Sequence, residues 1–148
     1  MSLNIGIDIG STTVKVVVME GKEILFKRYE RHFSQVRQKT AELLRAARET
    51  VGDRPFRVAL SGSAGFGLSK AAGIEFIQEV YATSKAVPFF DPDIDVIIEL
   101  GGEDAKILFL TGGVEERMNG TCAGGTGAFI DQMASLLDVT PGELDTLS

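Results

Sequence analysis

The sequence predicts an α/β fold made of two similar lobes, of which the second is incomplete. Two observations predict it. The chain opens with β-branched runs separated by short polar turns, followed by segments with helical spacing. The first turn then has a counterpart 91 residues later. We therefore expect a first lobe of order β-β-β-α-β-α over residues 1–90. A β-β-β-α start of a second lobe should occupy residues 91–148.

The first predicted element is a β-hairpin around a polar turn. Ile5, Ile7 and Ile9 alternate with Gly6 and Asp8, and a β-branched run over 14–18 follows the turn. The turn and its flanks carry the chemistry, through Asp8, Gly10, Ser11, Thr12, Thr13 and Lys15. A carboxylate can hold a hydrated cation, and backbone and hydroxyl donors can hold anionic oxygens. The pattern suits a metal-bound phosphate, and it also suits an ordinary hairpin with a polar turn.

The remaining segments of the first lobe are predicted from the spacing of apolar residues and from residues that typically begin or end a helix. We expect a third strand over 24–29 and a helix from a Ser34 cap to Val51, ended by Gly52. A short strand over 57–60, a structural Gly-rich loop over 61–67 and a helix over 75–87 come next. Pro88 should end that helix. His32, the only histidine, is predicted to be an exposed loop residue.

The second lobe is predicted from an internal repeat. A shift of 91 residues places Asp8 on Glu99, Gly10 on Gly101 and Lys15 on Lys106. Strands should cover 94–100, 106–110 and 114–118, followed by a helix over 127–137. Thr140 should cap a last short helix, with Glu143 at its third position. Each of the two turns directly follows a strand that ends near an acidic residue. If the two turns face each other, they would bind a phosphate chain from both sides.

Composition narrows the class of protein. The net charge is −6, with 15 basic and 21 acidic residues, which argues against a nucleic-acid-binding surface. Apolar runs stay shorter than the roughly 20 residues of a membrane span, and a signal peptide is not visible. The single cysteine, Cys122, rules out an internal disulfide framework. We therefore expect a cytoplasmic protein without a membrane partner.

Three stretches together resemble a known family: residues 6–15, residues 100–106 and the run Asn119-Gly120-Thr121-Cys122-Ala123-Gly124-Gly125-Thr126-Gly127. The first is shared across the superfamily of actin, hexokinase and heat-shock chaperone ATPases, whose lobes are ribonuclease-H-like. The set is similar to the activator ATPases of 2-hydroxyacyl-CoA dehydratases and the ATPase subunits of benzoyl-CoA reductases. This chain resembles about the first half of that family's domain.

The resemblance implies an ATPase that drives low-potential electron transfer to a dehydratase or related reductase component. ATP or ADP with Mg²⁺ would bind between the lobes, with Asp8 holding the Mg²⁺ through water. Terminal phosphates would contact Gly10, Ser11, Thr12, Thr13 and Lys15, with Gly101 and Gly102 approaching from the second lobe. Glu103 or Asp104 would orient the attacking water.

The resemblance also implies a role for Cys122. By its residue type alone, a lone cysteine is most simply a small buried hydrophobe. In the family, this cysteine and a later one, from each subunit of a homodimer, hold a single [4Fe-4S] cluster. Two such residues from a dimer of this chain supply half of the four ligands that the cluster needs.

Some residues depart from the family pattern, and two other classes of function remain open. Glu99 stands where Asp is usual, Glu103 where Gln is usual and Thr83 where His is frequent. The loop at 65–68 lacks the family's Arg. A small-molecule kinase of the same superfamily and a non-catalytic actin-like binding module are the alternatives.

Overall fold

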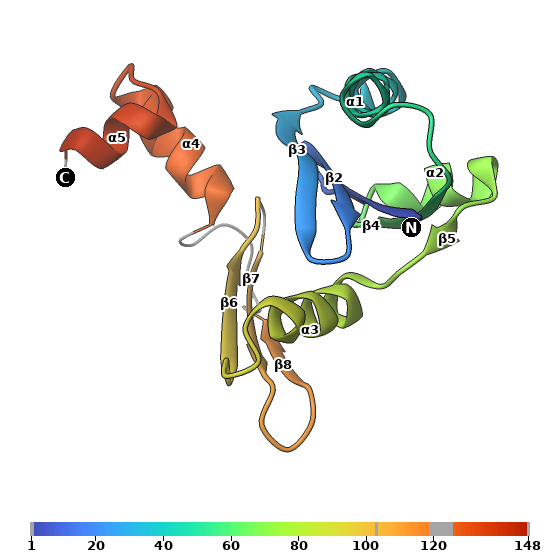
Figure 1. Cartoon of the computed structure of the whole chain (residues 1–148). Helices are drawn as coiled ribbons and strands as arrows, with labels where there is room; N and C mark the ends of the chain where they lie inside the picture. Colours follow the sequence, from blue (N-terminus) through green and yellow to red (C-terminus); the bar gives the residue numbers. More distant parts are fainter. Residues whose placement is uncertain (1, 103, 119–125, 148) are drawn as a thin grey trace. The chain divides into compact units, whose positions relative to one another are not determined.

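The computed structural model describes residues 2–102, 104–118 and 126–147, and Figure 1 shows the course of the chain. Contacts divide it into two compact units, Met1–Lys85 and Ala86–Ser148. The elements of the first unit are β1 (Leu3–Ile9), β2 (Thr13–Glu20), β3 (Glu23–Arg31), α1 (Val36–Val51), β4 (Phe56–Ser61), α2 (Gly65–Ala72), β5 (Glu75–Phe76) and the start of α3 (Glu79–Phe90). The second unit contains the end of α3, then β6 (Val96–Leu100), β7 (Ala105–Phe109), β8 (Glu115–Met118), α4 (Gly127–Leu136) and α5 (Pro141–Leu147).

The first unit is built on one mixed sheet with the strand order β3-β2-β1-β4-β5. β1, β2 and β3 pair antiparallel, as the short turns between them require. β4 is parallel to β1, and β5 is parallel to β4, because α1 and α2 return the chain to the same end of the sheet. The predicted opening of three antiparallel strands is confirmed.

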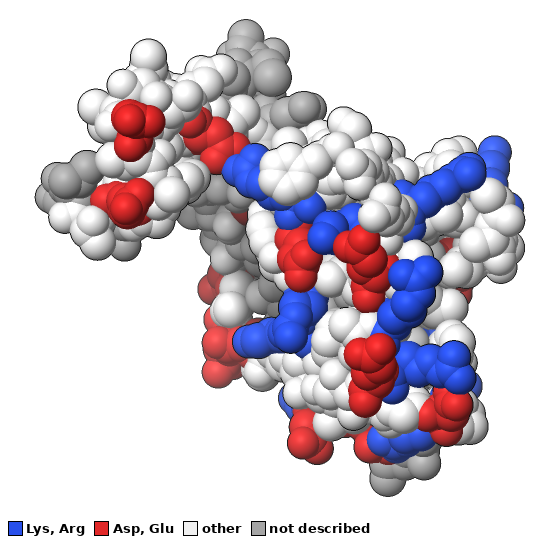
Figure 2. Space-filling view, turned by 90° about the horizontal axis from the view of Figure 1, so that it is seen from above, with Lys and Arg blue, Asp and Glu red and all other residues white. Residues whose placement is uncertain are grey.

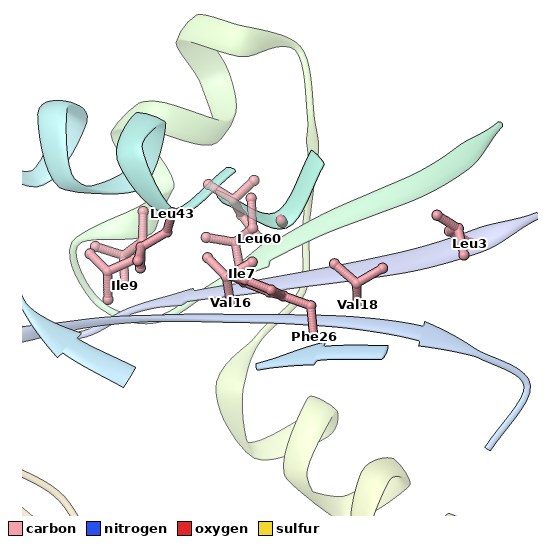
Figure 3. Packing of buried hydrophobic residues seen from close by; sticks show 10 residues of the cluster. Leu3, Ile7, Ile9, Val16, Val18, Phe26, Leu43 and Leu60 are labelled. Carbon is pink, nitrogen blue, oxygen red and sulfur yellow. The ribbon is translucent and has the colours of Figure 1, made fainter. Parts of the chain in front are cut away.

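The core of the first unit lies between α1 and the sheet (Figure 3). Val14, Val16 and Val18 of β2 are fully buried, at alternate positions that point to one face. Leu43 and Ala47 of α1 belong to the same cluster. The period-two pattern of β2 therefore packs against the apolar stripe of α1.

The start of α1 differs from the prediction. Gln35 precedes the helix, no side chain caps it, and Ser34 has φ 65° in the turn before it. The end agrees, because the N–H of Gly52 donates to the Arg48 carbonyl. On the face that Figure 2 shows, basic and acidic side chains are interspersed. Arg48 forms an ion pair with Asp53, and the Arg48 guanidinium holds the pKa of the Asp53 carboxyl below its usual range.

The predicted helix over 75–87 is wrong at both ends. Residues 75 and 76 form β5, because the chain turns at Gly73 in the left-handed region and pairs with β4. Pro88 lies inside α3, which continues to Phe90. A proline removes one helical hydrogen bond and strains the preceding turn, but the helix can continue past it. α2, between β4 and β5, was not predicted at all.

The second unit contains an antiparallel sheet of order β6-β7-β8, followed by α4 and α5. All three predicted strands and the helix after residue 126 are confirmed. The predicted cap of α5 is also present. The N–H of Thr140 donates to Glu143 Oε2 at 2.7 Å, and the N–H of Glu143 donates to Thr140 Oγ1 at 3.3 Å. Within the described ranges, no helix combines the length and the apolar character that crossing a membrane requires.

His32 is buried, not exposed as predicted, and it supports the first turn. Its side chain is 6% exposed. The N–H of Ser34 donates to Nδ1 at 3.1 Å, and Nε2 lies 3.1 Å from the carbonyl oxygen of Gly10. Because Nδ1 accepts, Nε2 carries the hydrogen and donates to Gly10. The turn between β1 and β2 is thus tied to the segment that leads into α1.

We expect His32→Ala to lower the free energy of unfolding by about 1–3 kcal/mol, because it leaves two polar backbone groups without their partner. Urea denaturation followed by circular dichroism measures this change. Phe33→Ala is the matched control, since Phe33 is the neighbouring residue and is 76% exposed. Equal stability of the two variants would contradict this role of His32.

Candidate functional site

Asp8 and Lys15 form an ion pair near the turn of the first hairpin. The antiparallel register places them opposite each other, and Lys15 Nζ lies 2.6 Å from Asp8 Oδ2. Burial alone lowers the pKa of Lys15, but the hydrogen bond and the attraction from Asp8 outweigh it and raise the pKa above its ordinary value. Lys15 therefore keeps its positive charge at neutral pH, beside the side chain of Asp8.

The turn between the two strands presents hydroxyl groups to solvent. The N–H of Gly10 donates to the Thr13 carbonyl at 2.9 Å, which closes the turn. Ser11 and Thr12 are exposed at its tip, while the side chain of Thr13 is 7% exposed. Two of the three predicted hydroxyl groups are thus accessible to an approaching ligand.

The other oxygen of Asp8 faces the loop that follows β4. The parallel register of β1 and β4 pairs Asp8 with Ser61. Gly62 has φ 90°, and a Cβ atom there would lie 2.3 Å from the Ile9 carbonyl oxygen and 2.6 Å from Asp8 Oδ1. Only glycine tolerates both the conformation and this approach. The loop after β4 therefore packs directly on the carboxylate.

The second hairpin has the register of the first. Glu99 pairs with Lys106, and the N–H of Gly101 donates to the Asp104 carbonyl at 2.8 Å. Lys106 is 6% exposed, with Nζ 3.9 Å from Glu99 Oε1 and 3.6 Å from Asp104 Oδ2. The 91-residue offset thus reproduces the acid, the lysine and the hydrogen bond that closes the turn.

The turn of the second hairpin also holds the start of α4. The N–H of Gly127 donates to the Gly101 carbonyl at 2.9 Å, and the N–H of Ala128 donates to the Gly102 carbonyl at 2.8 Å. A Cβ atom on Gly127 would lie 3.2 Å from the Gly101 oxygen. Turn and helix are therefore joined through the backbone.

The predicted site residues fall into two groups, one in each unit. Asp8, Gly10, Ser11, Thr12, Thr13 and Lys15 share the first hairpin, and Gly101, Gly102 and Asp104 share the second. Glu103 and Cys122 lie outside the described residues. Sequence reasoning missed four nearby contributors: His32, Ser61, Gly62 and Lys106. For Gly62 the signal was its place directly after a short apolar strand, and for Lys106 it was the repeat itself.

Comparison with known proteins relates this architecture to one family. Residues 5–148 match the BadF/BadG/BcrA/BcrD ATPase family. The (R)-2-hydroxyglutaryl-CoA dehydratase activating ATPase of Acidaminococcus fermentans is 31% identical, over 97% of this chain and 56% of that protein. The activator of lactoyl-CoA dehydratase of Anaerotignum propionicum is 32% identical, over 97% of this chain and 57% of that protein.

A solved structure agrees with these relatives. The activator of the 2-hydroxyisocaproyl-CoA dehydratase from Clostridium difficile, with bound ADPNP, has a TM-score of 0.81 to this chain at 29% identity. The match covers 96% of this chain and 55% of that one. The chain spans about half the length of the curated relatives it matches. Its mixed sheet has the actin-like ATPase fold, and the chain belongs to the BadF/BadG/BcrA/BcrD ATPase family.

Proposed function

We propose that this chain is the N-terminal ATPase part of an activase that acts on a 2-hydroxyacyl-CoA dehydratase or a related reductase component. The observation that carries the proposal is the match, over nearly the whole chain, to relatives that are named as dehydratase activators. ATP hydrolysis would be coupled to low-potential electron transfer to the partner. The cytoplasm is the proposed location.

The first hairpin fits a magnesium nucleotide. Asp8 Oδ1 is buried and has no hydrogen-bond partner, while Oδ2 is occupied by Lys15. Mg²⁺ is a hard cation that binds carboxylate oxygen and retains several waters. We therefore assign Oδ1 of Asp8 to a water of the cation. When bound, Mg²⁺ would neutralise phosphate charge during phosphoryl transfer.

The remaining groups of the first hairpin suit phosphate oxygens. Ser11 and Thr12 offer exposed hydroxyl groups, and Lys15 adds a positive charge two residues into β2. Gly10 allows close approach to the backbone, and Thr13 closes the turn. In the second unit, Gly101 and Gly102 are proposed to approach the phosphates. Glu103 or Asp104 is proposed to orient the attacking water.

The electron-transfer part of the proposal concerns Cys122, which lies outside the described residues. It is the only cysteine of the chain and precedes α4 by a few residues. We propose that it is one ligand of a [4Fe-4S] cluster held between two copies of the complete protein. The thiolate ligands would come from Cys122 and a later cysteine of each copy, which makes up the four that the cluster requires.

We expect Asp8→Asn in the complete protein to lower ATPase activity by on the order of a hundredfold, because positioning and electrostatics carry most of phosphoryl transfer. The substitution keeps the shape of the side chain and removes its charge. Phosphate release at saturating ATP and Mg²⁺ is the measurement, with the exposed Asp93→Asn as control. Activity within a few-fold of wild type would remove Asp8 from the mechanism.

ADP formation only with an added phosphate acceptor would favour a kinase.

We expect Cys122→Ala to abolish cluster assembly in the complete protein. Anaerobic reconstitution of wild type should yield about four iron atoms per dimer, and the variant should yield almost none. Asp8→Asn is the matched control, because it alters the nucleotide site and should retain its iron. The same iron content in wild type and Cys122→Ala would return Cys122 to a packing role.

A further inference from the structure

Two buried oxygens of the first unit lack a hydrogen-bond partner, and both lie at the end of the same strand pair. They are Asp8 Oδ1 and Ser61 Oγ. An unpaired buried polar atom destabilises a protein, and native proteins satisfy nearly all such atoms with protein groups or ordered water. Two such oxygens on residues that pair in neighbouring strands point to a shared partner.

The fold brings these two atoms together. Asp8 and Ser61 are register partners in the parallel pair of β1 and β4, so their side chains project from the same face of the sheet. Both line one cavity of about 360 Å³, which is also lined by Lys15.

The two oxygens suit one particular ligand. Neither accepts nor donates a hydrogen bond directly to the other. The Asp8 carboxylate acts as an acceptor, and the Ser61 hydroxyl oxygen has free lone pairs. A water bound to a cation directs its lone pair to the metal and donates both of its hydrogens. Such a water needs two acceptors.

We propose that Asp8 Oδ1 and Ser61 Oγ hold one water molecule between them, and that this water becomes a ligand of the divalent cation when a magnesium nucleotide binds. Ser61 is then a positioning residue for the hydrated cation. Gly62 supports the arrangement, because a side chain there would collide with Asp8 Oδ1. The cation step rests on the proposed function, while the water itself does not.

The test compares three variants of the complete protein: Ser61→Ala, Ser61→Thr and the control Ser63→Ala, in which an exposed hydroxyl of the same loop is removed. Calorimetric titration with ADP over a series of Mg²⁺ concentrations is the measurement. Ser61→Ala should raise the Mg²⁺ concentration at half-maximal ADP affinity by about five- to tenfold, the effect of one lost hydrogen bond. Affinity for ADP without Mg²⁺ should not change.

The other two variants make the result specific. Ser61→Thr retains the hydroxyl group and should stay within about twofold of wild type, as should Ser63→Ala. An unchanged Mg²⁺ midpoint in Ser61→Ala overturns the proposal. So does an equal loss of ADP affinity with and without Mg²⁺, because that result indicates a merely structural role.

A crystal structure of the nucleotide-free wild type tests the water separately. We expect an ordered water within hydrogen-bond distance of both Asp8 Oδ1 and Ser61 Oγ, and its absence would overturn the proposal even if Ser61→Ala fails to fold. If the wild type binds no ADP at any Mg²⁺ concentration, the proposed function is refuted. The crystal structure alone then decides whether the water is present.

Discussion

The pairing of β1 with a different neighbour on each side is the constraint on which the first site depends. The antiparallel register with β2 places Lys15 beside Asp8, and the parallel register with β4 places Ser61 on its other side. A slip of one residue in either pair would turn Asp8 toward the core and Ile9 toward solvent. Burial of Ile9 at 0% exposure opposes that slip. The hydrophobic core thus sets the orientation of a carboxylate that takes no part in it.

The second hairpin uses the same register with a different balance of charge. Asp8 and Lys15 form a one-to-one contact, whereas Lys106 lies between two carboxylates, those of Glu99 and Asp104. Lys106 is also more deeply buried than Lys15. A buried ammonium requires nearby negative charge, so the two acids stabilise it. The repeat therefore preserves the backbone of the turn while the electrostatics of the two copies differ.

Much of this architecture was predictable because its signals are local. Alternation in 14–18 predicts β2, and the Thr140 to Glu143 spacing predicts the cap of α5. The errors arose where tertiary contacts decide. Residues 75 and 76 join a sheet only because β4 is already in place, and His32 is buried only because Gly10, 22 residues earlier, lies beside it. Asp8 could be identified as a site residue from its turn, whereas Ser61 becomes apparent only from strand pairing.

Pro88 has a mechanical consequence. Pro88 has no backbone N–H, so the carbonyl of Ser84, four residues earlier, lacks its usual helical hydrogen bond. The same turn of α3 contains the border between the two units, at Lys85 and Ala86. A helix bends most easily where one of its backbone hydrogen bonds is absent. The helix that connects the two units therefore lacks one backbone hydrogen bond next to the border between them.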